Sequence, residues 1–72
     1  MDATLFWLSN AENEDEVFAY GIELSDDDVI EAVTFRRDPR TQRTTFGTHD
    51  SAEAALARYG RLFPIALHYE GC

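Results

Sequence analysis

The sequence has no lysine, only one cysteine, and no apolar run longer than four residues. A single cysteine, Cys72, excludes a disulfide within the chain and favours a reducing compartment. Runs this short cannot span a membrane, and the first residues lack the basic start of a signal peptide. We therefore expect a cytoplasmic protein that does not associate with membranes.

The sequence also lacks the motifs that catalysis usually needs. The four glycines are scattered, so there is no phosphate-binding loop, and no Gly-x-Ser-x-Gly elbow is present. The two histidines, His49 and His68, are interpreted as polar residues at the surface or beside a helix cap. Most carboxylates occur in solvated runs, whereas a general acid needs an apolar pocket that raises its pKa. We expect no enzymatic activity and no cofactor.

One acidic segment approaches the pattern of a calcium loop. Oxygen ligands alternate in Asn10, Glu12, Glu14 and Glu16. The sixth loop position should be glycine and the twelfth glutamate, but the sequence has Asp15 and Gly21 there. We predict no dedicated metal site.

The residues that are present suffice for one small domain over residues 1–72. Hydrophobic residues make up 44% of the chain, which argues against disorder. A domain of this size is stabilised by only about 3–5 kcal/mol. Residues 3–9 are apolar on both faces and predict a central strand. Residues 16–24 alternate and predict a second strand, with a buried face made of Phe18, Tyr20, Ile22 and Leu24. Gly21 indicates a bulge or a close backbone approach.

Residues 25–28 fit either a helix start that would continue to Val33 or a turn. The β-branched alternation of residues 29–35 favours a turn followed by a strand. Asp38 and Pro39 predict another turn, and residues 44–48 a return strand. The tip of this hairpin then carries arginines at four positions: Arg36, Arg37, Arg40 and Arg43.

A helix is predicted after Asp50, which we take as its N-cap with Glu53 three residues later. Its apolar stripe is Ala52, Ala55, Leu56 and Tyr59, and Gly60 ends it. Residues 62–69 predict a last strand, at an edge because Pro64 lacks an N–H, with Phe63, Ile65, Leu67 and Tyr69 facing inward. The expected order is β-β-β-β-α-β, an α+β domain with one helix on a mainly antiparallel sheet.

Charge is divided unevenly along the chain. Residues 1–31 carry ten acidic residues and no arginine, whereas residues 32–72 carry six arginines and four acidic residues. The arginine hairpin, with Phe35 and Phe46 for base stacking, would be the best case for direct nucleic-acid binding. A net charge of −8 argues against it. These arginines could instead neutralise nearby carboxylates or bind the acidic half of a second copy, which leaves a homodimer open.

The predicted partner-binding residues are the carboxylates of the acidic half: Glu12, Glu14, Asp15, Glu16, Glu23, Asp26, Asp27, Asp28 and Glu31. In a meander, the first two connections lie at opposite ends of the sheet, so we expect the charge to form a band. In an extended segment, Glu12, Glu14 and Glu16 would recur at roughly 6.6–6.8 Å, comparable with two nucleotide rises of about 3.4 Å each.

By size, charge and the runs at residues 12–16 and 26–28, the chain resembles phage-type acidic DNA-mimic inhibitors, which include anti-restriction and some anti-CRISPR proteins. The resemblance implies a non-enzymatic protein that occludes the nucleic-acid-binding surface of a basic partner. The alternative is a small globular module of unknown partner, whose acidic surface serves only to keep it hydrated, as in salt-adapted proteins.

Overall fold

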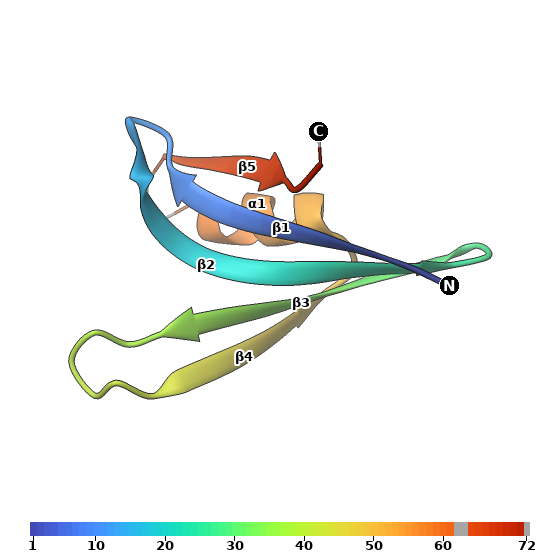
Figure 1. Cartoon of the computed structure of the whole chain (residues 1–72), viewed down its shortest axis with the longest axis horizontal. Helices are drawn as coiled ribbons and strands as arrows, with labels where there is room; N and C mark the ends of the chain where they lie inside the picture. Colours follow the sequence, from blue (N-terminus) through green and yellow to red (C-terminus); the bar gives the residue numbers. More distant parts are fainter. Residues whose placement is uncertain (62–63, 72) are drawn as a thin grey trace.

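The computed structural model describes residues 1–61 and 64–71. Five strands and one helix follow the predicted order: β1 (Asp2–Asn10), β2 (Asn13–Asp26), β3 (Val29–Arg37), β4 (Thr44–His49), α1 (Ala52–Tyr59) and β5 (Ile65–Tyr69). The strands form one antiparallel sheet in the order β4-β3-β2-β1-β5 (Figure 1). The α+β prediction is therefore confirmed, with β1 inside the sheet and β5 at an edge.

The segment with two possible structures forms a tight turn between two strands. Asp26 pairs with Val29, so the turn consists of Asp27 and Asp28. Asp27 has a left-handed φ of 53°, which aspartate adopts more readily than most residues. The helical alternative for residues 25–33 is thus wrong, because the β-branched residues after the turn pair with β2.

The helix begins one residue later than predicted. Ser51, not Asp50, is the N-cap: its backbone is extended, and its hydroxyl accepts a hydrogen bond from the Ala54 N–H at 3.0 Å. The backbone N–H of Gly60 donates to the Leu56 carbonyl at 2.8 Å and closes the last turn. The last strand begins at Ile65. The predictions for Phe63 and for the Cys72 thiol fall outside the described residues.

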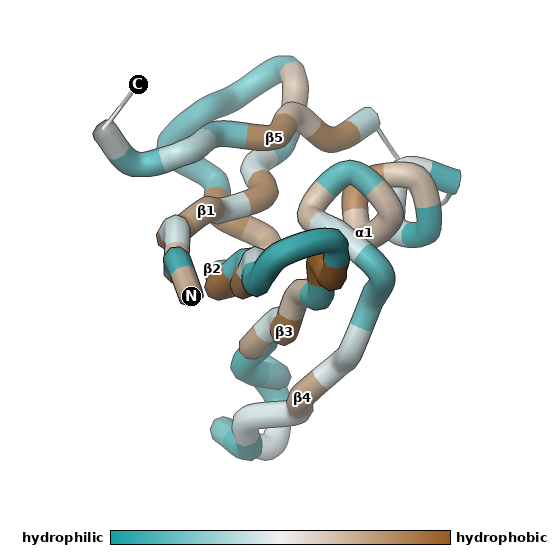
Figure 2. The backbone as a smooth tube through the Cα atoms, turned by 90° about the vertical axis from the view of Figure 1, so that its right-hand side faces the viewer, coloured by the Kyte–Doolittle hydropathy of each residue, from teal (hydrophilic) through white to brown (hydrophobic). Residues whose placement is uncertain are grey.

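The helix covers one face of the sheet, and nothing in the described part of the chain covers the other (Figure 2). The core between helix and sheet consists of Phe6, Leu8, Ala19, Ala32, Ala52 and Ala55. Four of these six residues are alanines, so the helix can approach the sheet closely.

The predicted buried face of β2 is wrong over most of its length. Ala19 is buried and Gly21 lies under the Phe6 ring, whereas Tyr20 is 60% exposed on the opposite face. A register shift explains why Phe18 nevertheless faces the helix: Leu8 pairs with Ala19 and Ser9 with Val17, which inserts Phe18 between the two pairs. Such a bulge turns two successive side chains to the same face.

Candidate functional site

The first acidic group lies at the tip of the β1–β2 hairpin. Its exposed members are Glu12, Glu14, Asp15 and Glu16. Asn10 shapes the tip, because its side-chain oxygen accepts from the Glu12 N–H at 2.8 Å and its amide donates to Glu16 at 3.3 Å. A second register shift, between Ser9–Val17 and Asn10–Asn13, inserts residues 14–16 into β2. Glu12 lies in the turn, so the even spacing expected for an extended segment does not include it.

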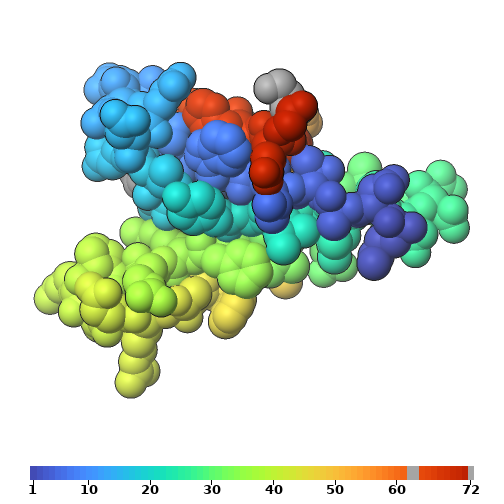
Figure 3. Space-filling model, in the orientation of Figure 1, coloured from blue at the N-terminus to red at the C-terminus, as the bar shows by residue number. Residues whose placement is uncertain are grey.

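The second acidic group lies at the β2–β3 turn, at the opposite end of the sheet, as the meander predicts (Figures 1 and 3). Asp26, Asp27, Asp28 and Glu31 are all exposed. The amino group of Met1 approaches Asp26 to 3.9 Å, with both groups largely exposed. An exposed pair of this kind contributes little to stability. These carboxylates are therefore accessible to a partner.

Glu23 has a different environment from the other predicted residues. Its carboxylate accepts a hydrogen bond of 2.8 Å from the backbone N–H of Ala52, the first residue of α1. The free N–H groups of a helix start favour a negative charge there. Glu23 thus ties β2 to the helix. We assign it a structural role and leave it out of the candidate partner surface.

In the structure, the uneven distribution of charge along the chain becomes a difference in charge between the two ends of the molecule. All six arginines lie toward the end that holds the β1–β2 tip and the β3–β4 hairpin, because α1 runs back to it and brings Arg58 and Arg61 there. The other end of the described chain has no arginine and eight of the fourteen acidic residues: Asp2, Glu23, Asp26, Asp27, Asp28, Glu31, Asp50 and Glu53. We call these two regions the arginine end and the acidic end. The sequence alone placed only four of the arginines together, at the tip of one hairpin. The positions of Arg58 and Arg61 depend on the direction in which α1 runs back along the sheet.

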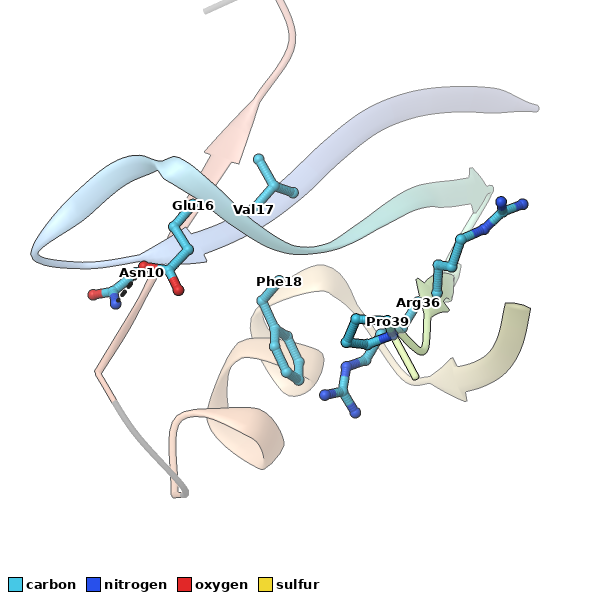
Figure 4. A pocket seen from close by; sticks show the side chains of 7 residues that line it. Asn10, Glu16, Val17, Phe18, Arg36 and Pro39 are labelled. Carbon is cyan, nitrogen blue, oxygen red and sulfur yellow. Dashed lines mark hydrogen bonds between the residues drawn. The ribbon is translucent and has the colours of Figure 1, made fainter. Parts of the chain in front are cut away.

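A hollow of about 290 Å³ opens at the arginine end between the two hairpins (Figure 4). The Arg36 guanidinium lies 4.3 Å from the centre of the Phe18 ring, in cation–π contact. Phe18 in turn meets Tyr59 edge to face at 5.1 Å. The lining residues are Asn10, Glu16, Val17, Phe18, Arg36, Arg37 and Pro39. This set offers charge and aromatic contact, and it contains no serine, threonine, cysteine or lysine.

The two histidines make specific contacts that the sequence did not reveal. His68 Nε2 lies 2.8 Å from Ser9 Oγ, and its ring stacks on Trp7 at 5.3 Å. Ser9 is fully buried, and the serine–histidine pair joins β5 to β1. The pair arises from the β1–β5 register, for which the sequence carries no local signal.

His49 lies beside the helix cap, as interpreted, but its ring packs inward. Its Nε2 is 3.2 Å from the hydroxyl of Thr34, which is buried, and its ring meets Tyr59 edge to face at 5.5 Å. Burial lowers the pKa of His49 below its usual value of 6.5, the Arg58 charge lowers it further, and Asp50 opposes the shift.

We expect His49 to make stability fall as pH drops below about 6.5. Above this pH the ring is neutral in both states; below it the unfolded chain binds the proton more readily, so unfolding is favoured until the pH reaches the lower pKa of the folded state. Thermal melts of wild type and His49→Gln between pH 7.5 and 5 would measure the difference. Since every carboxylate is shared by both proteins, parallel pH curves would contradict this role of His49.

Within residues 1–61 and 64–71, no three His, Cys, Asp or Glu side chains are placed to hold a metal ion together. The helix that the structure describes is too short and polar to cross a membrane. No family model, curated protein or solved structure matches this chain.

Proposed function

We propose that this protein is a non-enzymatic interaction protein whose acidic end, with the exception of Glu23, occupies the nucleic-acid-binding surface of a basic partner. One observation carries the proposal: the carboxylates of the acidic end lie on a folded scaffold with no arginine among them. A concentrated negative field of this kind attracts basic surfaces and repels nucleic acid. Function as a DNA-mimic inhibitor is the specific form that we propose.

The β2–β3 turn supports this proposal better than the β1–β2 tip. Asp26, Asp27 and Asp28 project at the far end of the sheet, away from every arginine side chain. At the β1–β2 tip, Glu16 lines the same hollow as Arg36 and Arg37, so the field there is partly neutralised. The mode of action that fits is occlusion by charge and shape, with no bond made or broken.

The test compares two triple variants with the same change in net charge. Asp26→Asn/Asp27→Asn/Asp28→Asn removes three charges from the acidic end and retains a residue type that tolerates the left-handed φ of Asp27. Glu12→Gln/Glu14→Gln/Asp15→Asn removes three from the other end. We expect the first to weaken binding to a basic nucleic-acid-binding protein by about 10- to 100-fold and the second by much less.

The partner would be found by capture on the immobilised protein at low and high salt, and its affinity then measured for each variant. The same partner should release duplex DNA or RNA when this protein is added. Equal effects of the two triples, or an affinity insensitive to salt, would contradict the proposal. A capture that yields no basic partner would favour the alternative, in which the carboxylates only hydrate the surface.

A further inference from the structure

The uncovered face of the sheet carries a continuous row of rings. Register pairs place Trp7 opposite Tyr20, Tyr20 opposite Phe35, and Phe35 opposite Phe46, while His68 flanks Trp7 on the other side. Directly paired residues share a face, so the row crosses all five strands. It is held by the stacked Trp7–His68 pair and by an edge-to-face contact of 5.2 Å between Phe35 and Phe46.

A second row of smaller side chains runs beside the first. Leu5 pairs with Ile22, Ile22 with Val33, and Val33 with Thr48, all on the same uncovered face. Several members of the two rows are open to solvent: Phe46 is 71% exposed and Leu5 is 51% exposed. Monomers rarely leave a contiguous apolar patch of this kind uncovered. The face therefore has the composition of an interface.

We propose that a second copy of this chain covers this face, in a two-fold dimer whose strands run in opposite directions in the two sheets. The two-fold axis would lie between the sheets, perpendicular to the strands, at the level of Thr34. The ring row of each copy would then pack on the smaller row of the other, with Phe35 against Val33 of its partner. Large side chains facing small ones are what two packed sheets require.

Charge on β3 supports the same arrangement. Two charged residues of β3, Glu31 and Arg37, lie on the uncovered face. Glu31 is three positions from Thr34 on the acidic side of the axis, and Arg37 is three positions from Thr34 on the opposite side. The two-fold reversal places each Glu31 opposite the partner's Arg37. The same operation brings the acidic end of one copy over the arginine end of the other. The strand is therefore self-complementary in charge as well as in shape.

The extent of the face fits a weak, reversible dimer. Five strands about 4.8 Å apart, each contributing about seven residues at about 3.3 Å, present roughly 500 Å² per copy. The total of roughly 1,000 Å² is near the lower limit for a specific interface. Two chains of charge −8 also repel one another, so dimerisation should appear at high protein concentration and moderate salt. The proposal does not depend on the proposed function.

The experiment measures the dimer dissociation constant by sedimentation from 10 µM to 1 mM, with a reductant to prevent cross-linking through Cys72. Glu31→Arg should weaken the dimer about tenfold because it faces Arg37 of the partner, although it lowers the general repulsion. Arg37→Glu should weaken it likewise. The double variant Glu31→Arg/Arg37→Glu has the wild-type net charge and should restore the wild-type constant.

A matched pair of surface variants tests the face itself. Phe46→Thr should weaken the dimer about tenfold or more, whereas Ile30→Thr, at a 51% exposed residue of β3 on the helix side, should not. Melting curves of all variants would establish that they are folded. A monomer at every concentration would overturn the proposal and imply a different protein as the occupant. A dimer that the double variant fails to restore would overturn it too.

Discussion

Phe6→Ala is expected to leave the protein largely unfolded at room temperature. Phe6 is 1% exposed, lies over Gly21, and meets Tyr69 with ring centres 6.4 Å apart. Truncating a buried phenylalanine costs about 3–5 kcal/mol, since both the burial and the packing around it are lost. The whole stability of a domain this small is about 3–5 kcal/mol. One substitution can therefore remove nearly all of it.

Circular dichroism and urea unfolding would measure this loss against a matched control. Phe46→Ala deletes the same atoms from a ring that is 71% exposed, and we expect it to lower the free energy of unfolding by less than about 1 kcal/mol. A Phe6→Ala protein as stable as the Phe46→Ala control would show that Phe6 is not the centre of the core.

Gly21→Ala is expected to destabilise the protein by about 2–3 kcal/mol, the upper part of the usual range for overpacking. A methyl group at position 21 would overlap three atoms of the Phe6 ring, which is itself enclosed and cannot move away. The conformation of Gly21 is not the reason, because its φ is not in the left-handed region. The reason is the close approach of the Gly21 backbone to the Phe6 ring.

Because the clash is with the Phe6 ring, a variant with a smaller side chain at position 6 provides the control. Phe6→Leu shortens the side chain over position 21, so the double variant Gly21→Ala/Phe6→Leu should be more stable than the sum of the two single effects indicates. Urea unfolding of the four proteins gives the coupling between the two sites, and we expect about 1 kcal/mol or more. Strictly additive effects would mean that the alanine is accommodated elsewhere.

Local patterns in the sequence were enough to predict the elements and their order. β-branched runs and turn residues marked the strands, and the apolar stripe of residues 52–59 marked the helix. The buried face of β2 was not predictable in the same way, because alternation separates two faces without saying which one the helix covers. We assigned the larger side chains Tyr20, Ile22 and Leu24 to the core. The buried side of β2 instead consists of small residues: Ala19 belongs to the core beneath the helix, and Gly21 lies under the Phe6 ring.

The candidate site was predictable to a similar degree. Runs of adjacent carboxylates such as residues 26–28 cannot be buried, and their exposure followed from that alone. The exception was Glu23, whose bond to the Ala52 N–H joins residues 29 apart in the chain. The separation into an acidic and an arginine end also depended on three-dimensional structure, since only the course of α1 decides where Arg58 and Arg61 lie. Partner binding by the remaining carboxylates stays a prediction.

The position of β1 inside the sheet has a consequence for synthesis. Its outer neighbour is β5, the last strand of the chain, whereas every other pair of neighbouring strands is also consecutive in sequence. While the chain emerges from the ribosome, β1 to β4 can pair as successive hairpins, but one edge of β1 stays open until residues 65–69 appear. During that interval the apolar strand is a template for pairing with other nascent chains. The last strand therefore completes the sheet and also protects the first.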